Sequence, residues 1–164
     1  GYVSEDRLTL GLVQQQSVAD NAVLTILDKL RGRFRLIDDY RKNRIVTEWI
    51  AKLGVRVADP EQAVSTLSGG NQQKIVLAKW VLTQPRILIL DSPTVGVDVG
   101  AKASIYQLIH LLAQEGIAIL LISDEVPEVY YNCDRVLHFS GGSVIGEYLP
   151  GQVSQQQLAE AVNA

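Results

Sequence analysis

A serine followed by two glycines stands directly before a helical pattern in the first half of the sequence. The stretch runs from Leu67 to Lys74 and reads LSGGNQQK. Glycine lets a backbone approach a ligand closely, and the first amide groups of a helix can bind an anion. The hydroxyl of Ser68 adds a further polar group, so the stretch suits a phosphate. A plain turn capped by Ser68 would explain the same residues, and for this stretch alone it is the simpler interpretation.

An aspartate closes a short apolar run later in the chain. Residues 87–90 are Ile-Leu-Ile-Leu, and Asp91 follows them. In an open α/β sheet, the residue after such a strand lies at the carboxyl edge, where ligands bind. A carboxylate there can hold Mg²⁺ against nucleotide phosphates, directly or through water. Asp91 is therefore a candidate magnesium ligand.

The two segments together resemble the motifs of ATP-binding cassette (ABC) transporter ATPases, and the resemblance covers nearly the whole chain. It matches residues 67–74 to the signature loop, 87–91 to the Walker B strand and 96–98 to the D-loop. The residues that it implies as nucleotide-binding are Ser68, Gly69, Gly70, Gln72 and Asp98.

Three further stretches more closely resemble one branch of the family. They are SEDR near the start, the asparagine in LSGGNQQK, and the run GVDVGAK. The branch is the second cassette of two-cassette ATPases that drive bacterial import of simple sugars such as ribose, galactose or xylose. No G-x-x-x-x-G-K-[ST] pattern occurs in the sequence. In the family this phosphate-binding loop lies upstream of the matched motifs, so we expect the chain to be the C-terminal part of one cassette, with weak ATP binding of its own.

Three positions depart from the family pattern. Ser92 stands where the family usually has the glutamate that acts as general base, and a hydroxyl is a very weak base at neutral pH. Asp124 stands at the position of the switch histidine, where a carboxylate repels a γ-phosphate unless a cation intervenes. Glu5 replaces a glutamine that contacts Mg²⁺, and it can still ligate that ion. The ATP site built on this cassette's own motifs is therefore expected to hydrolyse ATP poorly.

The resemblance also implies how the chain works with its partners. In the family two cassettes pair head to tail, and each signature loop completes the ATP site of the other. We therefore expect an energy-coupling component of a simple-sugar importer that uses ATP and Mg²⁺. Its partners would be a second cassette and membrane permease subunits, at the cytoplasmic face of the bacterial inner membrane. The parent protein is expected to be an ATPase, whereas this chain alone is expected to be inactive.

Two alternatives remain open. One is a regulatory or scaffold cassette that binds nucleotide without turnover. The other is a DNA-repair or chromosome-structure ATPase, which shares the signature loop. It is disfavoured because the sequence has no long coiled-coil heptads.

The composition limits the classes of function further. The chain has 164 residues, of which 47% are hydrophobic and 20% charged, as in an ordinary folded domain. Its net charge of −3 disfavours electrostatic binding to nucleic acid or to an anionic membrane. Cys133 is the only cysteine, which excludes an internal disulfide and a multi-cysteine metal site.

Hydrophobic periodicity predicts the elements that position these motifs. Ser17 and Asp20 can cap a helical segment, and a second amphipathic helix ends at Gly54. Residues 87–90 and 117–122 are predicted strands; both lack alternation, which is typical of strands covered on both faces. A helix is predicted between them, over 101–114. The later elements are a hairpin of residues 135–139 and 143–149 and a helix over 154–162.

The predicted fold class is α/β: the C-terminal portion of a P-loop NTPase cassette, with a mostly parallel sheet and a helical subdomain. Residues 1–14 are assigned to the end of the N-terminal lobe, with its Q-loop-like segment. Residues 15–84 are assigned to the helical signature subdomain. Residues 85–164 are assigned to the core portion that carries the Walker B strand, the D-loop and the switch region.

Overall fold

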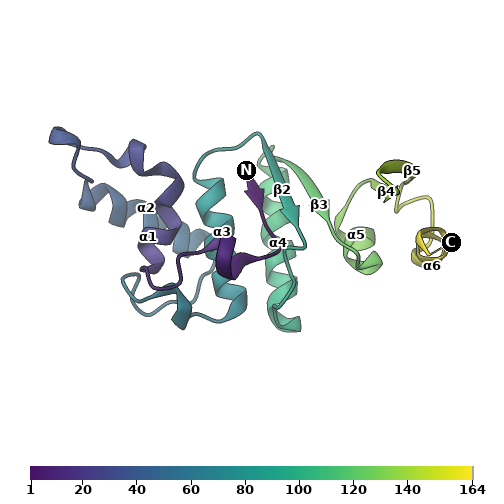
Figure 1. The fold of residues 1–164 in the computed structure, drawn as a ribbon, viewed down its shortest axis with the longest axis horizontal. Helices are drawn as coiled ribbons and strands as arrows, with labels where there is room; N and C mark the ends of the chain where they lie inside the picture. The colour runs from purple at the N-terminus through teal and green to yellow at the C-terminus, as the bar shows by residue number, and fades with distance from the viewer. Residues whose placement is uncertain (164) are drawn as a thin grey trace. The chain divides into compact units, whose positions relative to one another are not determined.

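A short sheet with parallel pairing lies in the first part of the chain. Its strand order is β1 (Tyr2–Val3), β2 (Ile87–Asp91) and β3 (Ala118–Ile122). β1 runs parallel to β2, and Figure 1 shows the two strands next to each other. The structure is a computed structural model that describes residues 1–163, except for the side chain of Arg33. The predicted combination of a parallel sheet with helices is confirmed.

The two apolar strands are not covered on both faces, so that expectation is wrong. Leu88 and Leu90 of β2 are fully buried, whereas Ile87 is 58% exposed. Leu120 of β3 is 50% exposed. The buried face of β2 packs toward α3, because Leu88 and Trp80 of that helix both lie against Gly1. The opposite face keeps apolar side chains in contact with solvent, which a continuous apolar run does not reveal.

Helices and short turns occupy most of the chain up to residue 116. In chain order they are η1 (Arg7–Gly11), α1 (Val18–Val23), η2 (Leu24–Leu30), η3 (Arg33–Arg35), α2 (Asp39–Lys52), η4 (Val64–Thr66), α3 (Gly69–Val81) and α4 (Val99–Gln114). Here η1 is a π-helical turn, and the other η elements are 3₁₀ turns. α3 contacts both α1 and α4, as can be followed in Figure 1.

The predicted start of the first helix at Ser17 and the predicted end of the second at Gly54 are confirmed, whereas the first α-helix ends at Val23 and continues as the 3₁₀ turn η2. Ser17 is the N-cap of α1, and its Oγ accepts a hydrogen bond from the amide of Asp20. After α2, Gly54 adopts a positive φ of 58°, which glycine tolerates best. The predicted apolar face of α2 packs on a buried cluster from α1 and η2; it contributes Val46 to that cluster and adds Ile45, Trp49 and Ile50.

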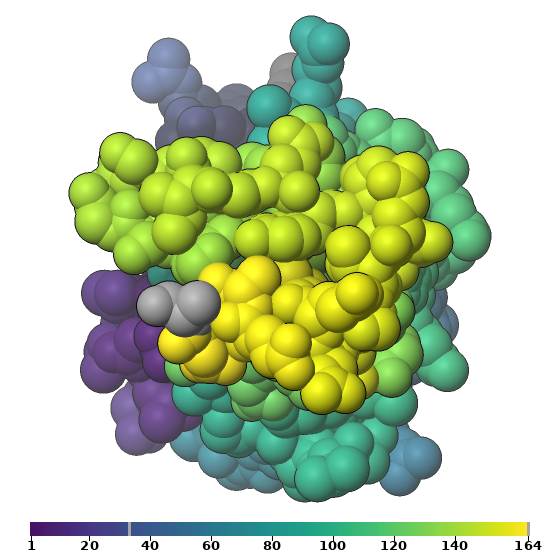
Figure 2. Space-filling view, turned by 90° about the vertical axis from the view of Figure 1, so that its right-hand side faces the viewer, coloured from purple at the N-terminus to yellow at the C-terminus, as the bar shows by residue number. Residues whose placement is uncertain are grey.

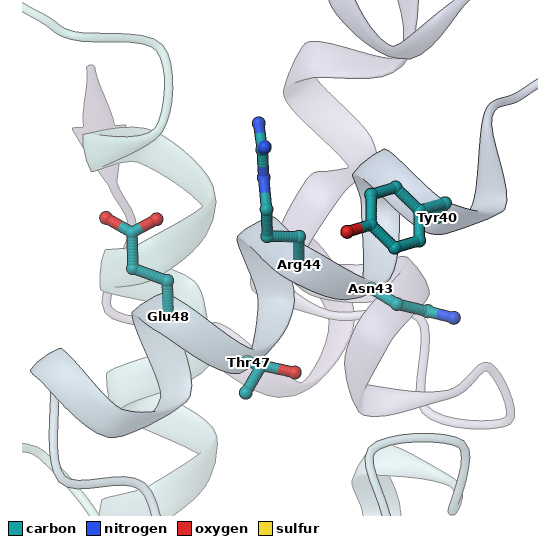
Figure 3. A pocket seen from close by; sticks show the side chains of 5 residues that line it. All are labelled: Tyr40, Asn43, Arg44, Thr47 and Glu48. Atoms are coloured by element: carbon teal, nitrogen blue, oxygen red, sulfur yellow. The ribbon is translucent and has the colours of Figure 1, made fainter.

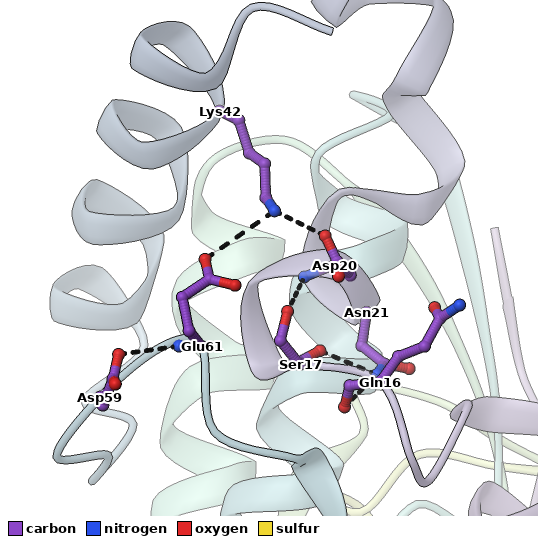
Figure 4. Close-up of polar contacts among 7 residues, drawn as sticks. All are labelled: Gln16, Ser17, Asp20, Asn21, Lys42, Asp59 and Glu61. Atoms are coloured by element: carbon purple, nitrogen blue, oxygen red, sulfur yellow. Dashed lines mark hydrogen bonds and ion pairs between the residues drawn. The ribbon is translucent and has the colours of Figure 1, made fainter.

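A polar cluster holds α2 against α1 and the loop before η4 (Figure 4). The ammonium of Lys42 donates to Asp20 Oδ1 at 2.5 Å and lies 3.8 Å from Glu61 Oε1. The Lys42 side chain is largely buried, whereas that of Asp20 is half exposed. The hydrogen bond from Lys42 lowers the pKa of Asp20 below its usual value, although partial burial opposes this. The ionised form of Asp20 therefore stabilises the fold.

Replacing Lys42 by methionine is expected to lower the free energy of unfolding by about 1 kcal/mol at pH 7, because Asp20 loses its charged donor. The pKa of Asp20 is lower in the folded chain than in the unfolded chain. Its contribution is therefore present above pH ~4 and is lost as the pH falls through the folded pKa. Urea unfolding of wild type and variant at pH 7 and at pH 3 measures this: the difference should shrink at pH 3.

The control is Arg31→Met, which removes an exposed pair with Asp28 and should change stability by less than about 0.5 kcal/mol. A difference between wild type and Lys42→Met that is the same at both pH values would contradict the assignment to Asp20.

The last part of the chain forms a separate compact unit, which covers residues 121–164; the first unit covers residues 1–120. The second unit contains α5 (Val126–Asn132), β4 (Val136–Ser140), β5 (Ser143–Tyr148) and α6 (Gln155–Val162). β4 and β5 form the predicted antiparallel hairpin, which turns at two glycines with positive φ. Figure 2 shows the hairpin in yellow-green next to the yellow C-terminal segment. Ala164 lies outside the described residues, and the predicted division at residues 14 and 84 remains a prediction.

Candidate functional site

The candidate signature loop leads directly into α3. Ser68 occupies the N-cap position but makes no capping bond, and its Oγ instead accepts a hydrogen bond from the side-chain amide of Asn71 at 3.0 Å. The amide of Gln72 donates to the carbonyl of Ser68 at 2.9 Å. The backbone amides ahead of Gln72 belong to the first turn, where a helix offers them no acceptor. The plain capped turn is thus not what forms here. The exposed Ser68 and the first amides of α3 leave the loop suited to an anion.

Gln72 lies in the interior rather than beside Ser68 at the surface. Its side chain is buried, and its amide donates to the carbonyl of Val64 in η4 at 3.3 Å. This bond ties the first turn of α3 to the segment that precedes the loop. In the described conformation, Gln72 therefore supports the loop instead of presenting its amide outward.

The two glycines of the loop allow close packing within the chain. A Cβ atom on Gly70 would lie 2.5 Å from the Cβ of Ala101 in α4. A Cβ on Gly69 would lie 2.9 Å from both the carbonyl oxygen of Gly96 and Nη2 of Arg7. Both distances are too short for real Cβ contacts. The sequence predicted that these glycines allow a ligand to approach closely. Nothing in the sequence indicated that they are also needed for close packing inside the chain.

Asp91 ends β2 at the expected edge of the sheet. The hydroxyl of Tyr2 donates to Asp91 Oδ2 at 2.9 Å. This hydrogen bond is the main reason why the pKa of Tyr2 is raised; burial and the charges of Asp91 and, more weakly, Glu5 add to it. Tyr2 therefore connects β1 to the carboxylate at the end of β2.

The acidic residues fit a magnesium ion that is bound mainly by other ligands. Among residues 1–163, no group of three or more His, Cys, Asp or Glu side chains is arranged to hold a metal. Mg²⁺ in nucleotide sites typically takes one or two carboxylates and completes its shell with phosphates and water. Asp91 and Glu5 meet that requirement in number and chemistry.

The remaining predicted residues lie in two separate units. Ser92, directly after β2, is half-buried and has a positive φ of 46°. Asp98 is the N-cap of α4, and its Oδ1 accepts a hydrogen bond from the amide of Ala101 at 2.9 Å. Asp124 belongs to the second unit, where it is exposed in the turn between β3 and α5.

Two shallow hollows lie on the surface of the helical region, away from these residues in sequence. The larger, of about 450 Å³, follows one exposed side of α2 (Figure 3). Its lining residues are Tyr40, Asn43, Arg44, Thr47 and Glu48. The smaller, of about 200 Å³, shares Asn43 and Thr47 and extends over Asp59–Glu61. None of the predicted nucleotide-binding residues lines either hollow, so these cavities do not form the candidate site.

Comparison with known protein families identifies the family to which this chain belongs. A family model described as "ABC transporter" matches residues 1–95, which include residues 67–74 and 87–91. The chain belongs to the ABC transporter family. The resemblance stated from the motifs is confirmed at this level.

Curated members of the ABC family match almost the whole chain. It is 45% identical over 159 residues to the xylose import ATP-binding protein XylG of Pectobacterium atrosepticum, a match that covers 97% of the chain and 31% of that protein. It is 48% identical over 158 residues to the ribose import ATP-binding protein RbsA 1 of Rubrobacter xylanophilus, with 96% and 31% covered. The chain therefore spans about a third of the length of these relatives.

A solved ABC structure has the same fold. The dimeric ATP-binding cassette MJ0796, in a post-hydrolysis state with ADP and Pi, superposes with a TM-score of 0.74 and 20% sequence identity. The match covers 92% of this chain and 62% of that one. Over the part of this ABC family member that the structure describes, no helix is both long and apolar enough to cross a membrane.

Arg7 is the residue at this site that the sequence did not single out. Its guanidinium donates to the backbone carbonyls of Val95 and Gly96, at 2.6 and 2.8 Å. The sequence contained it only as the last letter of SEDR, and the contact spans nearly 90 residues. A pattern of neighbouring residues carries no information about such a pairing.

Proposed function

We propose that the chain is part of the second cassette of an ABC ATPase that energises the import of a simple sugar. Xylose and ribose import ATP-binding proteins match it over almost its full length. The motifs that distinguish this branch, SEDR and GVDVGAK, occur in the sequence. The observation that carries the proposal is the signature loop, because its exposed Ser68 and the first amides of α3 are available to an anion.

The signature loop is proposed to complete the ATP site of a partner cassette. Ser68, Gly69 and Gly70 would meet the γ-phosphate that the partner holds, and Gln72 would keep the loop in place from inside. Asp98 lies at the start of α4, against which the buried Gly70 packs. The dimeric arrangement of the solved cassette MJ0796 is consistent with this pairing.

The chain's own ATP site is proposed to bind Mg²⁺-ATP but to turn it over slowly. Asp91 and Glu5 supply carboxylates for the metal, whereas Ser92 and Asp124 lack the chemistry of a general base and a switch histidine. The same two residues favour the second candidate, a regulatory cassette that binds nucleotide without hydrolysis. The phosphate-binding loop would come from a part of the protein outside this chain.

Membrane permease subunits are the proposed partners of the helical region. Residues 15–84 would receive a cytoplasmic segment of the permease near Glu5, which places the protein peripherally at the inner face of the bacterial membrane. The net charge of −3 gives no basis for nucleic acid as a partner.

Ser68→Arg in the full-length ATPase tests this proposal. The larger, charged side chain would fill the space that the partner's γ-phosphate needs, so we expect kcat for ATP to fall at least tenfold. The matched control is Ser65→Arg, at an exposed position just before the loop, which should leave kcat within twofold. Wild-type turnover in Ser68→Arg would contradict a role of this loop in a shared ATP site.

A further inference from the structure

We propose that Arg7 is a positioning residue that fixes residues 95–98, which contain the candidate D-loop 96–98, against the signature loop. The inference rests on the function proposed above and adds a residue to it. Arg7 would not touch ATP itself. It would hold two ATP-facing segments in register and link both to the turn that follows Glu5.

The guanidinium of Arg7 forms a two-pronged contact with consecutive backbone carbonyls. Nη1 donates to Val95 O at 2.6 Å, and Nη2 donates to Gly96 O at 2.8 Å. The planar guanidinium of arginine offers two parallel donors at a fixed spacing, which the single ammonium of lysine cannot reproduce. This geometry fixes the orientation of the segment as well as its distance from η1.

The backbone of Gly96 is shaped around the guanidinium. Gly96 has a φ of 66°, a conformation that L side chains rarely adopt. A Cβ at this position would stand 3.2 Å from both Nη1 and Nη2 of Arg7. Glycine is therefore required here for two reasons, the backbone conformation and the room for Arg7.

The same guanidinium also borders the signature loop. A Cβ on Gly69 would lie 2.9 Å from Arg7 Nη2 and 2.9 Å from the carbonyl oxygen of Gly96. The side chain of Arg7 thus lies where the signature loop and residues 95–96 meet. Any shift of Arg7 must alter the spacing between these two segments.

The turn that carries Arg7 is anchored to the signature helix at its other end. The buried ammonium of Lys79 in α3 donates to the carbonyl of Gly11, the last residue of η1. Gly11 also packs against Val76 of α3, since a Cβ there would lie 3.2 Å from a Val76 methyl group. η1 is therefore held between α3 and residues 95–96 and connects the two.

The arrangement is not what stability alone would favour. Arg7 Nε is buried and has no hydrogen-bond partner among the described residues, and a buried donor without an acceptor is costly. The two acceptors belong to exposed residues, so water could replace the arginine there. Loss of Arg7 should therefore affect the geometry of the loops more than the stability of the fold.

The test compares Arg7→Lys with Arg31→Lys in the full-length ATPase, with Ser68→Arg as the reference for the proposed function. Arg31 is exposed and forms an ion pair with the exposed Asp28, so its variant should behave as wild type. For Arg7→Lys we expect kcat to fall about tenfold and KM for ATP to change less than twofold. Hydrogen exchange of the hydrogen-bonded amides of Gln72, Val95 and Val97 should accelerate at least fivefold, and Tm should shift by no more than about 5 °C.

Each outcome decides the assignment. Wild-type turnover in Arg7→Lys, while Ser68→Arg has lost activity, would overturn the role of Arg7 and leave the proposed function standing. A fall in kcat without faster exchange at Gln72, Val95 and Val97 would overturn positioning as the cause. A fall in kcat that merely follows a large drop in Tm would assign Arg7 to stability alone. Wild-type turnover in both Ser68→Arg and Arg7→Lys would refute the proposed function together with this inference.

Discussion

Replacing Ser92 by glutamate is expected to raise ATP turnover at the chain's own site by about a hundredfold, measured in full-length protein that also carries Ser68→Arg so that the partner's site contributes little. A positioned general base contributes typically 10²–10⁴-fold to a reaction, and the serine hydroxyl cannot act as one at neutral pH. Ser92 directly follows Asp91, the proposed magnesium ligand, so a carboxylate at this position would stand beside the phosphates. We expect the lower end of the range because Asp124 would still occupy the switch position.

The backbone at Ser92 is compatible with this change. Ser92 already adopts a left-handed conformation, with a φ of 46°. Glutamate is not β-branched, so it should tolerate this conformation about as well as serine does. The substitution therefore alters the chemistry of the side chain with little added strain.

Ser92→Gln is the matched control, because glutamine has the size of glutamate without a basic oxygen. Steady-state ATPase assays of Ser68→Arg alone and combined with Ser92→Glu or Ser92→Gln should show a rise only with glutamate. A rise in both variants would indicate a steric effect rather than a base. No rise in either would favour the regulatory cassette, whose site lacks more than a general base.

The elements that the sequence predicted correctly depend on neighbouring residues. Ser17 caps α1, Gly54 ends α2, and the glycine pair 141–142 turns the hairpin; each acts on backbone within a few positions. The position of Asp91 at the end of β2 was also predictable from neighbouring residues. An apolar run of four residues indicates the strand, and the aspartate that follows marks where the strand ends.

The features that the sequence did not predict depend on contacts over long stretches of chain. Whether both faces of β2 are covered depends on which helices pack there. Four consecutive apolar residues are compatible with a strand buried on both faces and with one buried on a single face. Arg7 contacts a segment nearly 90 residues away, so SEDR alone could not assign it a role. For Gln72, the motif indicated a polar residue near the phosphate, but the helical phase of α3 turns its side chain inward to Val64.

The glycines of the signature loop illustrate how one residue type satisfies two requirements. Their place before a helix suggested room for a phosphate, and the structure adds the close approach of α4 to Gly70 and of Arg7 to Gly69. A loop that presents its backbone to a ligand must also be held in place from behind. In this chain the same absence of a Cβ atom permits that packing, so adding a methyl group at Gly70 should destabilise the fold.

Gly70→Ala is expected to lower the free energy of unfolding by about 2 kcal/mol. The new methyl group would lie 2.5 Å from the Cβ of Ala101, so α3 and α4 would have to move apart. Overpacking of this kind costs about 1–3 kcal/mol, more than the helix propensity that alanine gains over glycine. Gly100→Ala is the control: its Cβ meets only Asp98 Oδ1, at 3.4 Å, and it should not destabilise the fold. Urea unfolding with the three proteins measures the effect.

A double variant identifies the clash as the cause. Ala101→Gly removes the methyl group that the new side chain would strike, although by itself it should cost up to about 1 kcal/mol in helix propensity. If the clash is responsible, Gly70→Ala combined with Ala101→Gly will be more stable than the sum of the single effects by at least about 1 kcal/mol. Strict additivity would mean that the methyl groups do not meet. In that case, the glycine at position 70 would be needed only for the approach of a ligand, as the motif alone suggested.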